Sequence, residues 1–459
     1  MHPRNPYRTP PDFSYLAKQY PALKPYLISK ATGTTINFKD NEGQSRRLTE
    51  ALLHRDFQLS VTIPDDRLCP PVLIHGTFRL NYILWMQDIV HATSIAEPEI
   101  SKRIIKGVDI GTGASAIYPL LGCQINPQWR FTATDVDDHS LQCARLNVQQ
   151  NNLQDRITVV QSDPAGPVIL SLFPNCTPEK VESTETSDMD FEFIMCNPPF
   201  YSSREDILHS AEAKEFEPTS VCTGADVEMI TPGGEAAFVR KIVNESLTLK
   251  TRCRWYTSML GKMSSLTDVV ALLREKNIAN YACTEFVQGQ TRRWAIAWSF
   301  GDVHLPDSLG RVANPALQRL MPPRNTLRQS YPGTIPNRFA SVTVSILSSI
   351  DSVSVQPCAE AARRPLDLLV TAHRDTWSRA SRRRKADPGT IQTDVDSRPT
   401  FLCRIRNIGD NAGVPQTTQG GDGSALVFDW VRGIDRALFE SFASHVGRKV
   451  SAMLISDVS

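Results

Sequence analysis

Hydrophobic and polar positions along the middle of the chain fall into alternating blocks that predict strands and helices in turn. Four short apolar runs predict buried strands, at residues 104–110, 129–134, 157–160 and 191–196. Between the second and third runs, Leu141, Ala144 and Val148 lie at helical spacing within residues 139–150. Strands and helices that alternate in this order predict an α/β fold with a parallel, doubly wound sheet.

The pattern changes on either side of this central region. Before it, Leu80, Ile83 and Leu84 lie at the spacing of a helix that leads into the first strand. After it, strand-like runs follow at 254–260 and 294–300. These segments extend the same domain.

Other segments lack the alternating pattern. Residues 201–234 are long and polar with few periodic apolar positions, which predicts a functional or disordered loop. Residues 301–335 carry many prolines and glycines, which predicts a linker. Beyond it, 340–355 is typical of strands and 437–446 of a helix. We therefore divide the chain into an N-terminal module at 1–100, an α/β domain at 101–300, a linker at 301–335 and a small C-terminal α+β domain at 336–459.

The composition narrows the class of protein. Hydrophobic residues make up 41% of the chain and charged residues 22%, which is typical of a folded globular protein. No run of eighteen or more apolar residues occurs, so we expect no membrane span. The ten cysteines are scattered and form no CxxC pair. This argues against a zinc site or other metal centre and against a disulfide framework, and favours a reducing compartment.

The distribution of charge is more informative than the net charge of +1. Two basic clusters stand out, one with Arg4 and Arg8 near the N-terminus and one with Arg382, Arg383, Arg384 and Lys385. Local basic patches can bind phosphate even in a neutral protein. A solvated surface is the alternative for both clusters, and a nuclear import signal is a further alternative for the second.

A glycine loop follows the first predicted strand of the α/β domain. Gly111 and Gly113 allow a ligand to approach the backbone, and the helix after them begins with free N–H groups. Asp135 ends the next strand, where an acid can hold ribose hydroxyls, although Asp137 and Asp138 follow at once. Without the full dinucleotide fingerprint, this pattern favours a nucleoside cofactor that has no pyrophosphate, such as S-adenosylmethionine (SAM).

The segment Asn197-Pro198-Pro199-Phe200 follows the fourth predicted strand and should face the same crevice as the glycine loop. The exocyclic amino group of adenine is a poor nucleophile because its lone pair is delocalised into the ring. The Asn197 side-chain oxygen and the Pro198 carbonyl can accept hydrogen bonds from that group, which frees the lone pair and aims the nitrogen at a methyl donor. Phe200 offers a face for stacking. These four residues are our candidate catalytic motif, and a rigid turn that ends in a buried aromatic is the alternative.

These motifs occur in the same order as in the methyltransferase-like protein 16 family, the adenosine N6-methyltransferases of U6 small nuclear RNA, and residues 1–300 resemble that family. The resemblance is carried by Pro10-Pro11-Asp12-Phe13, Arg79-Leu80-Asn81-Tyr82-Ile83, Gly107-x-Asp109-Ile110-Gly111-Thr112-Gly113-Ala114-Ser115, Asn197-Pro198-Pro199-Phe200, Arg254-Trp255-Tyr256, Met259-Leu260-Gly261-Lys262 and Arg293-Trp294-Ala295.

The resemblance implies a Rossmann-like, SAM-dependent methyltransferase domain with an N-terminal RNA-binding module. It implies a cofactor site made of Arg79, Asp109, Gly111, Gly113, Ser115, Asp135 and Asn197. Within that site, Arg79 and Ser115 would hold the methionine carboxylate and Asp135 the ribose. The resemblance also implies RNA contacts at Arg4, Arg8, Arg292 and Arg293. The 201–234 loop would gate the substrate, and 336–459 is a possible counterpart of the family's C-terminal RNA-binding region.

Three other functions remain open at this point. A ribosomal RNA adenine N6-methyltransferase would share most of the core motifs. A protein glutamine methyltransferase faces the same chemical problem, although such enzymes usually have Tyr where this chain has Phe200. An RNA-binding regulator without catalysis is the third. We expect a monomer that acts on RNA, in the nucleus and also in the cytoplasm.

Overall fold

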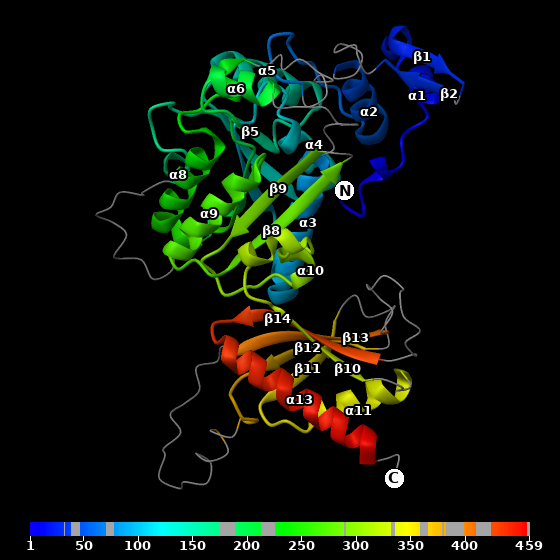
Figure 1. Cartoon of the computed structure of the whole chain (residues 1–459), viewed down its shortest axis with the longest axis vertical. Helices are drawn as coiled ribbons and strands as arrows, with labels where there is room; N and C mark the ends of the chain where they lie inside the picture. The colour runs from blue at the N-terminus through cyan, green and yellow to red at the C-terminus, as the bar shows by residue number, and fades with distance from the viewer. Residues whose placement is uncertain are drawn as a thin grey trace. The chain divides into compact units, whose positions relative to one another are not determined.

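The computed structural model describes residues 1–31, 33–37, 46–69, 78–173, 189–212, 225–288, 291–331, 336–358, 366–378, 381, 399–409 and 424–456. These residues form two compact units (Figure 1). The first unit comprises Met1–His91, Glu99–Gly301 and Leu309–Pro322. The second comprises Ala92–Pro98, Asp302–Ser308 and Pro323–Ser459.

The first unit is built on a seven-stranded sheet with the strand order β5-β4-β3-β6-β7-β9-β8. Its strands are β3 (Ile105–Ile110), β4 (Trp129–Asp135), β5 (Ile157–Gln161), β6 (Phe191–Cys196), β7 (Cys253–Leu260), β8 (Tyr281–Gln288) and β9 (Thr291–Trp298). Strands β3 to β7 pair in parallel, and β9 and β8 are antiparallel additions at one edge. This sheet confirms the predicted α/β, Rossmann-like class.

Helices cover both faces of this sheet. The main ones are α3 (Phe78–Ala96), α4 (Ile117–Ile125), α5 (Asp138–Gln150), α8 (Gly234–Leu249) and α9 (Met263–Glu275). Helices α8 and α9 lie side by side in Figure 1 and bury Val239, Val243 and Val270 against Val108 and Ile110 of β3. Successive residues of a strand point to opposite faces of the sheet. The residues of β3 that alternate with Val108 and Ile110 therefore point to the opposite face.

On that other face, β3 and α4 pack tightly against aromatic rings because each has a glycine at the contact. A Cβ atom at Gly107 would lie 2.5 Å from the Phe193 ring, and one at Gly122 would lie 2.6 Å from the Phe131 ring. Phe131 and Phe193 are themselves in edge contact, with ring centroids 5.6 Å apart. The two glycines therefore let an aromatic layer lie directly against the strand and α4.

The N-terminal residues belong to the first unit. They form α1 (Phe13–Gln19), α2 (Leu48–Phe57) and a hairpin of β1 (Leu27–Lys30) and β2 (Gly33–Ile36). The Met1 amino group donates to the Val287 carbonyl of β8 at 3.1 Å, and the Asn5 side chain donates to Asn81 of α3 at 2.8 Å. The structure therefore differs from the predicted boundary at residue 100, because these contacts join residues 1–91 to the α/β domain.

The described part of the predicted linker, residues 301–331, is also structured. It contains α10 (Asp307–Gly310) and β10 (Thr326–Tyr331). Leu317 and Leu320 are buried in the core of the first unit, whereas β10 pairs with a strand of the second unit. Prolines and glycines here shape short turns between buried residues. Short 3-10 turns across the chain are η1 (Pro6–Arg8), η2 (Pro21–Tyr26), η4 (Pro98–Lys102), η5 (Leu170–Leu172), η7 (Lys250–Arg252) and η8 (Pro315–Leu320).

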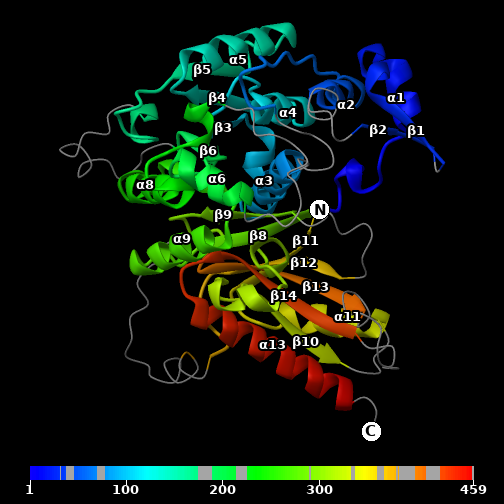
Figure 2. The same ribbon diagram turned by 45° about the horizontal axis from the view of Figure 1, so that its top comes forward.

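The second unit is an α+β domain, as predicted. Its antiparallel sheet has the order β10-β14-β13-β12-β11. The further elements are β11 (Val353–Pro357), β12 (Asp367–Ala372), β13 (Phe401–Gly409), β14 (Ser424–Gly433), α11 (Pro336–Ser348) and α13 (Arg436–Ser456). Helices α11 and α13 pack together and bury Phe339 and Phe442 in one core with the sheet (Figure 2). A smaller apolar cluster in this unit contains Ala96, Val303, Leu402 and Val431.

Two segments differ from their predictions. Residues 340–348 form part of α11 and not a strand, because Val342, Ile346 and Leu347 are buried at helical spacing. Within 201–234, the described residues form α6 (Arg204–Glu212) and α7 (Asp226–Met229), while 213–224 lie outside the described residues. Within the described part of the chain, no helix is long and apolar enough to cross a membrane.

Candidate functional site

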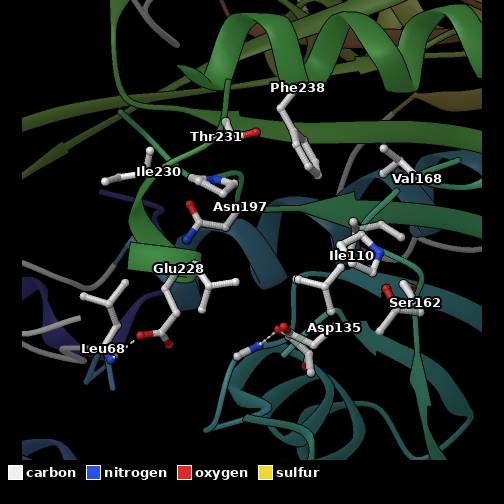
Figure 3. A pocket seen from close by; sticks show the side chains of 18 of the residues that line it. Leu68, Ile110, Asp135, Ser162, Val168, Asn197, Glu228, Ile230, Thr231 and Phe238 are labelled. Carbon is white, nitrogen blue, oxygen red and sulfur yellow. Dashed lines mark hydrogen bonds between the residues drawn. The ribbon is translucent and has the colours of Figure 1, made fainter. Parts of the chain in front are cut away.

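A pocket of about 360 Å³ opens at the carboxyl ends of β3, β4 and β6. Parallel strands present their carboxyl ends at one edge, where ligands bind in open α/β sheets. Seven of the predicted site residues line this pocket together, namely Arg79, Gly111, Gly113, Ser115, Asp135, Asn197 and Pro199. Figure 3 shows Asp135, Asn197 and Glu228 around it. Residues from five separate parts of the sequence thus meet at one place.

The glycine loop has the geometry that its sequence predicts. Gly111 and Gly113 have φ angles of 70° and 63°, in the left-handed region that favours glycine. The Gly113 N–H donates to the Asp135 carboxylate at 2.8 Å, which ties the loop to the end of β4. Asp137 instead accepts from the Ser140 N–H and caps α5. The structure therefore selects Asp135 over its acidic neighbours as the pocket residue.

Several buried polar atoms at this site have no hydrogen-bond partner among the described residues. Two belong to residues that line the pocket, the Thr112 hydroxyl and the Asn197 side-chain oxygen. The others are both carboxylate oxygens of Asp109, a predicted cofactor-binding residue that lies two residues before Gly111 and does not line the pocket. A buried polar group left in this way costs about 1–3 kcal/mol, so such groups at a pocket indicate a ligand that supplies partners. Burial also raises the pKa of Asp109 to about 8.

These groups fit SAM by their chemistry. The Asp135 carboxylate and the Asn197 amide oxygen accept hydrogen bonds, as hydroxyl and amino groups require. Arg79 provides a positive charge in the same pocket, which suits a carboxylate. The left-handed glycines leave the backbone open to a ligand. Among the residues that the structure describes, no group of three or more His, Cys, Asp or Glu side chains is placed to hold a metal ion.

The Asn197–Phe200 loop is anchored where it leaves β6. The Cys196 N–H, one residue before Asn197, donates to the buried Tyr82 hydroxyl at 3.4 Å, and that hydroxyl is 2.6 Å from the Thr257 hydroxyl of β7. Pro198 is buried, and Phe200 is half-buried beside the pocket without lining it. The end of β6 is therefore held by contacts to α3 and β7.

The predicted RNA-binding arginines lie in different surroundings. Arg293 lies over the rings of Phe200 and Phe78, and its neighbour Arg292 is exposed and pairs with Glu285 at 3.0 Å. Arg4 forms an ion pair with Asp88 of α3, while Arg8 is exposed. The cluster Arg382, Arg383, Arg384 and Lys385 lies outside the described residues. RNA contact at these positions stays a prediction.

The sequence analysis missed pocket residues that come from the segment after residue 224. Glu228 of α7 accepts from the Leu68 N–H at 2.9 Å and the Ala225 N–H at 3.1 Å with one carboxylate oxygen. Its other oxygen would lie 3.6 Å from a Cβ atom at Gly113, so it faces the glycine loop. Burial raises the pKa of Glu228. The available signal was weak, an acid three residues into a short helix within a polar segment.

Comparisons with known proteins agree with this geometry. Residues 1–302 match the model of a family described as RNA methyltransferase. "RNA N(6)-adenosine-methyltransferase METTL16" of Mus musculus is 38% identical over 405 residues, which cover 84% of this chain and 69% of that protein. "U6 small nuclear RNA (adenine-(43)-N(6))-methyltransferase" of Schizosaccharomyces pombe is 35% identical over 408 residues, which cover 89% of this chain and 93% of that protein.

Solved structures resemble the first unit. The human METTL16 catalytic domain in complex with MAT2A 3'UTR hairpin 1 has a TM-score of 0.53 and 41% identity, and the match covers 65% of this chain and 95% of that one. The N-terminal domain of human METTL16 in complex with SAH has a TM-score of 0.51 and 40% identity, and the match covers 66% of this chain and 99% of that one.

Proposed function

The chain belongs to the RNA N6-adenosine-methyltransferase family and uses SAM, and we propose that its substrate is U6 small nuclear RNA or a hairpin of similar structure. The names of its relatives support this choice, since one acts on U6 small nuclear RNA and another has been solved with a messenger RNA hairpin. We propose further that the protein acts in the nucleus as a monomer, where the basic run at 382–385 would serve import or RNA contact.

The observation that carries the proposal is the side-chain oxygen of Asn197. It is buried at the end of β6, lines the pocket and has no hydrogen-bond partner among the described residues. An adenine amino group offers two N–H donors, so Asn197 would accept one and the Pro198 carbonyl the other. These bonds localise the lone pair on nitrogen and orient it, and orientation is most of what methyl transfer requires.

The rest of the pocket has roles that follow from its chemistry. Bound SAM supplies an electrophilic methyl group. Arg79 would hold its methionine carboxylate and Asp135 its ribose hydroxyls, while Phe200 would stack on the target base. The N–C bond would form as the methyl–sulfur bond breaks, with S-adenosylhomocysteine as the leaving group. The amino nitrogen would then carry the positive charge and lose its proton to water. Within an RNA, the adenosine has to be flipped out of any base stack to reach Asn197.

The experiment is to incubate the protein with methyl-labelled SAM and a U6 transcript. We expect label on one adenosine, and a loss of about 10²–10³-fold in kcat for Asn197→Ala, since one aligned hydrogen bond is removed from the transition state. Asn314→Ala is the matched control, because that side chain caps η8 at the Ala316 N–H and does not line the pocket. Its kcat should equal that of the wild type.

Each contrary result points to one of the other functions. Label on protein alone would support glutamine methylation and end the RNA proposal. Label on ribosomal RNA but not on U6 would reassign the substrate. RNA binding with no transfer to any RNA would support a regulator without catalysis.

A further inference from the structure

Arg293 of β9 lies between two aromatic rings. Its guanidinium carbon is 5.3 Å from the centre of the Phe200 ring in the candidate catalytic motif and 5.8 Å from the centre of the Phe78 ring at the start of α3. A planar guanidinium stacks on aromatic faces in a way that an ammonium group does not reproduce. One side chain therefore connects β9, the first turn of α3 and the catalytic loop.

The guanidinium is directed at the protein's own groups. It donates to the Arg292 carbonyl at 3.1 Å and the Gly261 carbonyl at 3.5 Å. Burial lowers the pKa of Arg293, and the nearby Glu235 carboxylate opposes that shift. Glu235 is 2% exposed and accepts from the Gly261 N–H at 2.6 Å. An arginine that binds RNA phosphate presents its fork of N–H groups to solvent, whereas Arg293 is half-buried and its Nη1 donates to two backbone carbonyls.

Phe200 is confined from a second direction. A Cβ atom at Gly261 would lie 2.9 Å from the Phe200 ring, so the ring occupies space that exists only because residue 261 has no side chain. Glu235 fixes this turn by accepting from both the Gly261 and Lys262 N–H groups. Arg293 lies over one face of the Phe200 ring, and Gly261 lies against its Cδ1 and Cε1 atoms. In the proposed function, the target base would stack on the face away from Arg293.

We propose that Arg293 is a positioning residue, which holds the Phe200 ring at the angle that stacks the target adenine, and that it is not a phosphate contact. The proposal rests on the proposed function, in which adenine stacks on Phe200. It also divides the two neighbouring arginines of β9, because Arg292 is exposed and keeps the predicted role in RNA contact. A cation behind the ring strengthens the stack as well, since it draws ring electrons away from the face that the base meets.

The test separates positioning from charge with two substitutions and two measurements. Arg293→Met keeps the volume but removes the cation, and Arg293→Lys keeps the charge but loses the planar stack. We measure kcat and KM on the U6 transcript, and RNA affinity against salt concentration. Both variants should lose about tenfold in kcat, because neither keeps a planar guanidinium stacked on the Phe200 ring. The slope of log affinity against log salt should equal that of the wild type, because no phosphate contact is lost.

A phosphate contact would give the opposite pattern. Arg293→Lys would keep the wild-type kcat, and Arg293→Met would reduce the salt slope by roughly 0.7–0.9, the value for one released counterion. Either result overturns the proposal. Arg145→Met is the matched control, since Arg145 is exposed on α5 and outside the pocket, and neither its kcat nor its slope should change. If Arg293→Met does not fold, Arg293→Lys still decides between the two roles.

A double-mutant cycle with Phe200 tests the route of the effect. If Arg293 acts through the ring, Arg293→Met should cause no further loss of kcat in a Phe200→Leu protein. Losses that multiply would show that Arg293 acts independently, and would overturn the proposal. Wild-type protein that transfers no label to RNA overturns the proposed function and this inference together. Wild-type activity with the phosphate pattern overturns the inference alone.

Discussion

Asp109 lies near the end of β3, two residues before Gly111, and does not line the pocket; both of its carboxylate oxygens are buried without hydrogen-bond partners among the described residues. Burial raises its pKa to about 8, whereas an aspartate in an unfolded chain titrates near about 4. Between these values the folded protein keeps a proton that the unfolded chain has released. Stability contributed by this group is therefore present at low pH and is lost as pH rises from about 4 to about 8.

Replacing this acid should change how stability depends on pH. Asp109→Asn cannot ionise, so its free energy of unfolding relative to that of the wild type should rise by up to about 4 kcal/mol from pH 5 to pH 8 in the absence of cofactor, at about 1.4 kcal/mol per pH unit. Urea unfolding at the two pH values measures the difference. For Asp268→Asn, at an exposed position on α9, the difference in free energy of unfolding from the wild type should be small and equal at pH 5 and pH 8. A gain for Asp109→Asn that is equal at pH 5 and pH 8 would contradict the assignment.

Glu228 supplies the second prediction at this scale. One of its oxygens faces the glycine loop across the pocket, so we expect it to accept a hydrogen bond from the cofactor. Glu228→Gln should weaken S-adenosylhomocysteine binding by about tenfold, because a charge-assisted bond contributes about 1.5–3 kcal/mol. Calorimetry gives the Kd. Asp226→Asn, two residues away and paired with Arg204 on the surface, is the control. Equal affinity for Glu228→Gln and wild type would rule out the contact.

The site residues that could be predicted from sequence are those whose residue type and position after a predicted strand indicate their chemical role. Gly111, Asp135 and Asn197 each follow a recognisable strand, and parallel strands bring their ends together. The roles of Glu228 and Arg293 could not be predicted in this way. Glu228 lies on α7, and its place at the pocket depends on the path of the chain after residue 224. Arg293 contacts Phe200 only because β9 packs beside the catalytic loop.

At the scale of elements, the register of β3 against β6 places Gly107 beside Phe193. A Cβ atom at Gly107 would lie 2.5 Å from the Phe193 ring, and the neighbouring aromatic rings prevent the Phe193 ring from shifting away. Gly107→Ala should therefore destabilise the first unit by about 1–3 kcal/mol, the usual effect of overpacking. The free energy of unfolding from urea titration measures it.

The control for this prediction is Gly301→Ala. A Cβ atom at Gly301 would meet only the Ser299 hydroxyl, at the ordinary contact distance of 3.5 Å. Its free energy of unfolding should stay within about 0.5 kcal/mol of wild type. If Gly107→Ala were as mild as Gly301→Ala, the register or the aromatic packing would be wrong.

Element types were predictable where burial is periodic and uniform. Strands β3, β6 and β7 are short apolar runs that are almost entirely buried, so their sequences reveal them directly. A strand was predicted at residues 340–348 because valine, threonine and isoleucine favour strands locally. Burial of Val342 and Ile346 on one helical face outweighed that preference. Packing against a tertiary core determines the secondary structure where it buries more apolar surface than the locally preferred structure would.

At the scale of the whole molecule, the two units were harder to predict than either sheet. Composition predicts domain boundaries at single positions along the chain, but each unit consists of three separate segments of the chain. Leu317 returns to the first core after residues 302–308 have joined the second unit. Prolines and glycines mark turns, and turns occur within units as readily as between them. A linear reading of the sequence cannot distinguish the two cases.

The cluster of Ala96, Val303, Leu402 and Val431 has a consequence for how the protein is made. A ribosome releases Ala96 early, and the strand that holds Leu402 follows roughly 300 residues later, which takes roughly 15–60 s at typical rates of synthesis. During that interval the apolar side of this segment has no native partner. The nascent chain therefore exposes apolar surface of the kind that chaperones cover, until the last strands of the second unit have emerged and folded.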